Sequence, residues 1–351
     1  MSATLKTLRA GMRTTLQDLG RPGLQAIGLP VSGALDVMSL RLANALVGNA
    51  PGTGALEIRF FGPRLQVQAD SVRVALAGTE GFLKVEGEGF GLVPAGQSVT
   101  LPRGTIFGVE ALRDSATAYL AVAGGFDVAH PFGSCATYLP AALGGFDGHP
   151  LTEGAELPLC RSSAPDGPDL GTPQPVISGT GDVLRVVLGP QEDYFTKAGI
   201  ETFLSTRYTV TPQSDRMGMR LDGAAVEHGP AGFNIPSDGV VTGAIQVPGH
   251  GLPIVLLADR QTTGGYPKIA TVISADLPQL ARALPGTALR FRPVTPAEAE
   301  EIRRSAERKL QSVIDDLRPA GAAGFLQKLY SENLISGVVG GEGPLPSTLV
   351  E

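Results

Sequence analysis

The hydrophobic segments of this chain are short and are repeatedly interrupted by turn-forming residues. Residues 72–77, 118–123 and 183–188 are mostly apolar, and each run is bounded by Gly, Pro or Asp within a few residues. Runs of this length are typical of strands, because helices need longer stretches that are free of Gly and Pro. With 47 Gly and 28 Pro among 351 residues, such interruptions recur along the chain. The sequence therefore predicts a mainly β fold.

A change in composition divides the chain into two parts. Residues 161–175, RSSAPDGPDLGTPQP, gather Pro, Gly, Ser and Asp and lose all hydrophobic periodicity, which indicates a linker. A chain of 351 residues is long enough for at least two hydrophobic cores. We therefore expect an N-terminal β subdomain at 1–160 and a C-terminal β subdomain at 176–294.

A helical segment is expected after the second subdomain. Thr295, Pro296 and Glu298 form a capping box with proline at the first helical position. The apolar residues that follow recur every three or four positions, namely Ile302, Ala306, Leu310, Val313 and Leu317. This stripe predicts a helix in the segment 295–335 that packs onto the body of the protein. Residues 336–351 are rich in Gly and Pro and predict a tail that is loose or docks on a partner.

Charge and composition exclude several functions. A formal net charge of -6 without a basic stripe argues against nucleic acid as a partner. The N-terminus lacks the apolar core of a signal peptide and no run is long enough to span a membrane, so we expect no membrane partner and a cytoplasmic location. Cys135 and Cys160 are expected to be reduced. The four histidines are scattered, which predicts no metal site. A phosphate loop of the form G-x-x-x-x-G-K-[ST] is absent, so this chain alone does not show how ATP would bind.

The segment 243–276 carries the strongest functional signal. Its residues 254–258 predict a strand buried on both faces. This strand is followed at once by the polar run Asp259, Arg260, Gln261, Thr262 and Thr263, and then by Gly264 and Gly265. A carboxylate, a guanidinium, an amide and hydroxyls at a strand end suit a small planar ligand, and the glycines let main-chain N–H groups approach it. The alternative is a tight hairpin whose glycines serve only the turn.

Three further polar clusters have the same character. A glycine-rich N-terminal loop contains Asp18 and Arg21, Gln191 follows the apolar run at 183–188, and Ser214, Asp215 and Arg216 precede Gly218. Each cluster fits either ligand binding or an internal ion pair. Surface ion pairs contribute only about 0–1 kcal/mol, so stability alone is a weak reason for such compact clusters.

Ordered motifs over most of the chain resemble one family. The resemblance rests on DLGRPG at 18–23, LVGN at 46–49 with Leu56 and Glu57, GGF at 144–146, GPQ at 189–191, SDRMGMRLDG at 214–223 and the long block at 237–276. These motifs resemble the KipA-type family, also called allophanate hydrolase subunit 2 or the biotin-dependent carboxyltransferase family. One departure lies before GGF, where the family commonly reads GSRST and this chain has Cys135 in place of the arginine. An anion contact from that position is therefore in doubt.

The resemblance implies an architecture and a set of partners. It implies two β-rich subdomains related to the cyclophilin-like barrel, and a KipI-type subunit that completes the active site at a shared interface. One function that it implies is that of the C subunit in an ATP-dependent 5-oxoprolinase, which opens 5-oxoproline to glutamate together with a KipI-like B subunit and a LamB/YcsF-like A subunit. ATP would then be bound by a partner or shared with it.

Two other functions remain open at this stage. The chain could be a carboxyltransferase subunit that moves CO₂ from carboxybiotin to urea or a related amide, with biotin carried on another protein because this chain has no Met-Lys-Met site. It could also be a non-catalytic antagonist that sequesters a KipI-like kinase inhibitor. A chain without fused biotin carboxylase or carrier segments fits the 5-oxoprolinase hypothesis better.

Candidate roles follow from side-chain chemistry. Arg260 and Arg216 are predicted to hold a carboxylate or phosphoryl group, and Asp259 to orient an arginine or take a proton, unless Asp259 and Arg260 simply pair with each other. The residues predicted to bind the substrate are Gln191, Gln246, Thr262, Thr263, Gly264, Gly265, Tyr266, Ser214, Asp215, Asp18 and Arg21. Among them, Tyr266 is expected to close the pocket wall.

Overall fold

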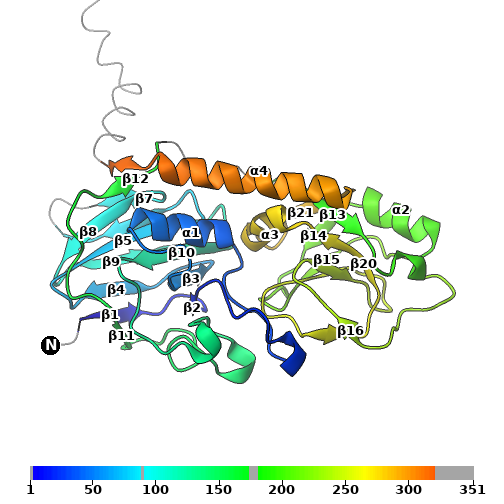
Figure 1. Ribbon diagram of the computed structural model, residues 1–351, viewed down its shortest axis with the longest axis horizontal. Coiled ribbons are helices and arrows are strands. Elements are labelled where there is room, and N and C mark those ends of the chain that lie inside the picture. Colours follow the sequence, from blue (N-terminus) through cyan, green and yellow to red (C-terminus); the bar gives the residue numbers. More distant parts are fainter. Residues whose placement is uncertain (1–2, 88–90, 174–180, 321–351) are drawn as a thin grey trace, which may run out of the picture.

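The protein consists of two β-rich halves that lie side by side beneath one long helix (Figure 1). The computed structural model describes residues 3–87, 91–173 and 181–320. Helix α4 (Pro296–Asp315) runs across both halves. The prediction of a mainly β fold with a C-terminal helix is thus confirmed, while the predicted tail at 336–351 lies outside the described residues.

The N-terminal half is built from two antiparallel sheets. The six-stranded sheet has the order β11 (Glu156–Pro158), β1 (Thr4–Arg9), β4 (Arg64–Val67), β9 (Ile106–Val109), β6 (Phe82–Val85) and β7 (Leu92–Pro94). The five-stranded sheet has the order β2 (Thr15–Gln17), β3 (Ala55–Arg59), β10 (Thr117–Val122), β5 (Ser71–Ala77) and β8 (Ser98–Pro102). Leu65 and Phe107 of the first sheet share a core with Val74 and Leu120 of the second. The two sheets therefore pack face to face.

Strand β10 shows why the apolar run at 118–123 is continuous. Every residue of β10 is buried. Leu120 faces the core between the two sheets, whereas Tyr119 faces a second core beneath helix α1 (Val37–Leu46). A strand that is covered on both faces does not alternate apolar and polar residues as a half-exposed strand does. The run at 118–123 is therefore continuously apolar because α1 covers the second face of β10.

The C-terminal half contains a closed barrel. Its strand order is β13 (Val183–Leu188), β20 (Lys268–Val272), β17 (Ala244–Gln246), β18 (Ile254–Leu256), β15 (Gly218–Asp222), β14 (Tyr208–Val210) and β21 (Ala288–Pro293). In β18, Val255 points into the barrel core and Leu256 packs with Val240 outside it. The strand predicted at 254–258 is therefore present as the shorter β18, and Val255 and Leu256 are buried on its two faces. Helix α2 (Lys197–Ser205) covers one end of the barrel through Phe203.

The segment predicted as a linker packs onto the N-terminal half for most of its length. Asp169 accepts hydrogen bonds from the Thr100 amide at 2.9 Å and from Arg73 Nε at 3.0 Å. Strand β12 (Leu170–Gly171) then pairs with β22 (Arg318–Pro319), which follows α4. Residues 161–171 thus belong to the first half of the structure, and residues 174–180 lie outside the described part.

Helix α4 begins as the sequence predicts and ends at Asp315, while residues 321–335 of the predicted helical segment lie outside the described residues. The Thr295 hydroxyl accepts from the Glu298 amide, and the Glu298 carboxylate accepts from the Thr295 amide at 2.7 Å. Leu310 is buried against α1, and Val313 and Leu317 pack beside it. The helix ends at Asp315 because the chain then turns into β22. In the described part of the chain, α4 included, no helix has the length and apolarity needed to cross a bilayer.

The two halves are also joined by helix α3 (Leu277–Arg282), which leaves the barrel and docks on the first half. The Ala116 amide donates to the Arg282 carbonyl at 2.9 Å, and the Thr117 hydroxyl donates to the Ala281 carbonyl at 2.7 Å. Arg282 Nη1 donates to Asp36, the N-cap residue of α1, at 2.8 Å. These contacts fix the position of the barrel relative to the sheets.

We expect Leu310→Ala to lower the free energy of unfolding by roughly 2–5 kcal/mol, because it removes a buried side chain from the contact between α4 and α1. Urea unfolding of the full chain measures this loss. Lys309→Ala changes the exposed neighbour and should stay within about 0.5 kcal/mol of the wild type. Equal effects of the two substitutions would mean that α4 does not stabilise the body.

Candidate functional site

The loops that carry the predicted site residues lie on the side of the molecule away from α4. In Figure 1 the dark blue segment around η1 (Gln25–Ile27) and strand β16 (Asp238–Gly239) lie on this side. Strand β16 pairs with β19 (Thr263–Gly264), which places the glycine-rich loop after β18 on the same side. We call this side the loop face.

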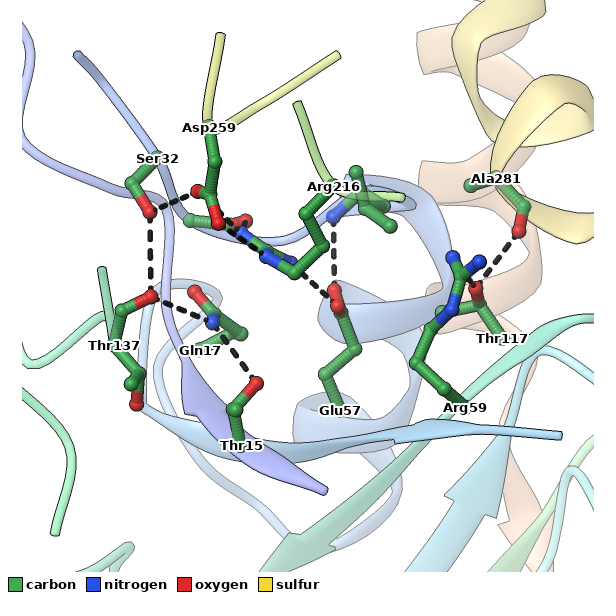
Figure 2. Close-up of polar contacts among 12 residues, drawn as sticks. Thr15, Gln17, Ser32, Glu57, Arg59, Thr117, Thr137, Arg216, Asp259 and Ala281 are labelled. Carbon is green, nitrogen blue, oxygen red and sulfur yellow. Dashed lines mark hydrogen bonds and ion pairs between the residues drawn. The ribbon is translucent and has the colours of Figure 1, made fainter. Parts of the chain in front are cut away.

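Arg216 links the two halves through a buried ion-pair network (Figure 2). Its Nε and Nη2 donate to the two carboxylate oxygens of Asp259 at 2.8 and 2.9 Å. Its Nη1 donates to Glu57 of β3, and Nη2 also donates to the Gly33 carbonyl at 2.7 Å. All three guanidinium nitrogens are therefore engaged within the protein.

The two carboxylates of this network are also fully engaged. Asp259 accepts from the Ser32 hydroxyl at 2.6 Å, and Glu57 accepts from the Leu35 amide at 3.0 Å and from the Tyr119 hydroxyl at 2.6 Å. Asp259 is 2% exposed and Glu57 is 0% exposed. Burial by itself lowers the pKa of Arg216, but attraction by both carboxylates outweighs it and raises the pKa above its ordinary value. Arg216 therefore stays charged.

The side chain of Arg260 does not join the ion-pair network of its neighbour Asp259. Its Nε donates to the Val240 carbonyl at 3.3 Å and its Nη1 to the Thr242 hydroxyl at 2.8 Å. The alternative that Asp259 and Arg260 pair with each other is wrong, because Asp259 pairs with Arg216. Within residues 3–87, 91–173 and 181–320, Arg260 has no carboxylate partner. The residue is 2% exposed, and burial lowers its pKa.

Asp18 and Arg21 have different roles in the N-terminal loop. Asp18 accepts from the Gly20 amide, the Ser134 hydroxyl and the Cys135 amide at 2.7, 2.7 and 2.8 Å, so it ties two loops together. Arg21 donates from Nη2 to the Ala136 carbonyl. Its Nε and Nη1 are buried without a hydrogen-bond partner among the described residues. Burial lowers the pKa of Arg21, and the carboxylates of Asp18 and Asp259 offset part of this.

The cysteine that replaces the family's arginine is part of the core. Cys135 is 2% exposed and packs with Leu16 and its neighbours. A Cβ added at Gly54 would lie 2.5 Å from its sulfur, so the thiol is closely enclosed. Burial raises the pKa of Cys135. In this chain, the side chain of Cys135 therefore cannot provide a positive charge to a bound ligand.

The predicted amide-binding residues converge around Lys268, a residue that we did not predict. Lys268 Nζ pairs with Asp238 at 2.8 Å. Gln191 bridges this pair, since its Oε1 accepts from the Lys268 amide at 3.1 Å and its Nε2 donates to Asp238 at 3.3 Å. Buried Gln246 lies alongside, and a Cβ added at Gly264 would clash with its Nε2. A larger residue at position 264 would thus force the Gln246 amide to shift.

The remaining predicted residues have local roles or lie exposed. The Ser214 hydroxyl accepts from the Arg220 amide at 3.1 Å, and Asp215 Oδ1 accepts from the Met217 amide at 2.8 Å. Both contacts stabilise the turn before β15. The residues that lie in the loop over the barrel are Thr262, Thr263, Gly265 and Tyr266, of which Tyr266 is 40% exposed.

Three charged residues of the site were missed as site candidates, namely Glu57, Asp238 and Lys268. Glu57 follows the apolar residues Ala55 and Leu56, and Lys268 precedes Ile269 and Ala270, so a charge beside a short apolar run is the signal that could have identified them. Asp238 is an exposed residue of the two-residue strand β16 and gives no comparable signal. Among the residues that the structure describes, no three His, Cys, Asp or Glu side chains are grouped as a metal ion would require.

Comparisons with known proteins point to one family of relatives. The family "carboxyltransferase domain, subdomain A and B" matches residues 27–293. The C subunit of 5-oxoprolinase from Escherichia coli K12 is 36% identical over 313 residues, which cover 88% of this chain and 97% of that protein. The corresponding protein from Haemophilus influenzae is 34% identical, with 86% and 94% covered. The crystal structure of Kluyveromyces lactis urea amidolyase superposes with a TM-score of 0.81 at 28% identity, covering 91% of this chain but only 21% of that one.

We expect Arg216→Met to lower the free energy of unfolding by about 3–5 kcal/mol, because it leaves Asp259 and Glu57 buried without their cation. Urea unfolding at neutral pH measures the loss. Arg220→Met, at an exposed position nearby, should be close to neutral.

A second substitution separates charge from packing. Adding Glu57→Gln to Arg216→Met removes one unpaired carboxylate and should recover part of the lost stability. If the double variant is less stable than the single variant, the loss arises from packing rather than from unpaired charge.

Proposed function

Because the chain belongs to the carboxyltransferase domain family, subdomains A and B, we propose that it is the C subunit of an ATP-dependent 5-oxoprolinase. The observation that carries this proposal is the 36% identity with the E. coli protein, which extends over 97% of that protein. The assembly would open 5-oxoproline to glutamate in the cytoplasm. Its other members would be a KipI-like B subunit and a LamB/YcsF-like A subunit.

The geometry supports a site that this chain supplies only in part. Arg216 and Asp259 are engaged with each other and with Glu57, so we assign them to positioning the loops rather than to contact with substrate. Arg21 remains, with two N–H-bearing nitrogens that have no partner in the described chain, close enough to Asp259 for its charge to act on it. A guanidinium with free N–H groups suits the planar carboxylate of 5-oxoproline.

The lactam itself would be recognised by amides. Gln191 and Gln246 lie near Lys268 on the loop face, and the main chain at Gly264 and Gly265 passes beside them. These groups can donate to the lactam oxygen and accept from its N–H. A glycine-rich phosphate loop is absent from the sequence, so we assign ATP to the companion subunits.

A carboxyltransferase role is the second candidate. It is favoured by the superposition on K. lactis urea amidolyase at a TM-score of 0.81. The chain spans only about a fifth of that protein, whose remaining length has no counterpart here. Because this sequence contains no Met-Lys-Met site, biotin would have to be carried elsewhere, and the substrate would be urea or a related amide.

The first test is reconstitution. We expect the purified chain alone to show no ATP hydrolysis with 5-oxoproline, and turnover to appear when the KipI-like and LamB/YcsF-like companions are added. Phosphate release and glutamate formation measure it. Transfer of CO₂ to urea with a biotin carboxylase and carrier, without 5-oxoproline turnover, would favour the carboxyltransferase. Tight assembly without either activity would favour the sequestering antagonist.

The second test concerns the proposed carboxylate contact. In the reconstituted complex, Arg21→Met should lower kcat/KM for 5-oxoproline by roughly 10²-fold, because a charge-assisted contact in a buried site is lost. Arg21→Lys should not restore it, since a lysine cannot reproduce the bidentate geometry. Arg113→Met, at an exposed position, is the control. Near-normal kcat/KM in a destabilised Arg21→Met variant would show that Arg21 is structural.

A further inference from the structure

A cavity lies between α4, the start of α1 and the outer wall of the barrel, away from the loop face. Its volume is about 320 Å³, at the lower end of the ~300–1,000 Å³ typical of small-molecule sites. The lining is mainly apolar and includes Leu35, Met38, Leu257, Leu277 and Ala306. The helix thus covers the barrel here without filling the space beneath it.

The cavity continues into a second hollow of about 290 Å³ below the first turns of α4. Both are lined by Thr242, Ser274, Leu277 and Arg303. The two hollows are therefore adjacent, with hydroxyl groups where they meet and mainly aliphatic walls. An elongated ligand with one polar end fits this shape better than a compact polar one.

Both carboxylates that line the hollows are paired, Glu300 with Arg304 and Glu307 with Arg41, which leaves arginines around the polar part. Arg260 donates to Thr242 Oγ1 at 2.8 Å from a buried position, and it has no carboxylate partner in the described chain. Because this oxygen accepts from Arg260, the hydroxyl hydrogen of Thr242 is left to donate into the cavity. Arg303 lines the opening, while Arg41 is paired with Glu307. The surroundings of Thr242 are therefore suited to an anion.

We propose that this cavity binds a small aliphatic carboxylate, with its carboxylate at Thr242 and Arg303 and its hydrocarbon chain along Leu35, Leu257 and Leu277. Burying the hydrocarbon chain stabilises the complex, and the unpaired Arg260 behind Thr242 attracts the negative end. Glutamate and 5-oxoproline do not fit, because their polar groups would lose water against apolar walls without gaining partners.

The occupant would contact the same segments that hold the interface network. Leu35 lines the cavity and its amide donates to Glu57, and Ala258 lines the cavity next to Asp259 in the chain. The site is thus distinct from the loop face but shares the backbone that positions Arg216. This inference goes beyond the proposed 5-oxoprolinase function and does not depend on it.

Binding of sodium octanoate to the full chain, followed by calorimetry and thermal unfolding, tests the proposal. We expect saturable binding with a raised Tm. Octan-1-ol, which has the same chain without the charge, should bind at least tenfold more weakly. Thr242→Val should weaken octanoate about tenfold, since it removes one hydrogen bond to a charged group.

Two matched variants locate the site. Ala306→Leu fills the cavity from α4 and should abolish octanoate binding, whereas Ser305→Leu at an exposed position of the same helix should leave it unchanged. The proposal is overturned by equal affinity for octanoate and octan-1-ol, by absence of binding to the folded wild type, or by unchanged binding to folded Ala306→Leu. Displacement of octanoate by 5-oxoproline or glutamate at comparable concentration would also overturn it.

Discussion

The structure depends on one guanidinium held between two buried carboxylates. Arg216 belongs to the barrel half, as does Asp259, while Glu57 lies on a strand of the N-terminal sheets. Desolvating three charges is costly, and the mutual attraction offsets this cost only when every lone pair and N–H group has a partner. Here Ser32 and Tyr119 supply the missing partners. The geometry of the network therefore fixes the two halves relative to each other.

The same network explains how the loop face is assembled. Arg216 also binds the Gly33 carbonyl, and Ser32 binds Asp259, so the N-terminal loop is held against the barrel. Helices α3 and α4 connect the halves on other sides, so the loop face is braced by the Arg216 network and by contacts between its own loops. Binding residues that sit on loops over a rigid scaffold can be positioned accurately while still facing a partner or ligand. This arrangement supports a site shared between polypeptides.

Sequence reasoning predicted elements better than contacts. The capping box at Thr295 placed the start of α4 correctly, and the continuous apolar run at 254–258 identified β18. The sequence did not predict which charged residues pair with each other. Arg216 and Arg260 have the same chemistry in the sequence, yet one is enclosed by carboxylates and the other is backed only by a carbonyl and a hydroxyl. Lys268 was missed because it is the first residue of its strand, where a lysine is usually exposed and gives only a weak signal, and its burial follows from closure of the barrel.

The sequence by itself determined the β character of both halves, the capped C-terminal helix and the family, because turn residues, hydrophobic spacing and ordered motifs are local properties of the chain. Only the tertiary structure decided the strand order of the barrel, that residues 161–171 pack on the first half, and which arginine is paired. Those outcomes depend on contacts between residues far apart in the chain, such as Glu57 and Arg216. The physical reason is that a buried charge takes its role from the partners that folding brings to it, and no local pattern specifies those partners.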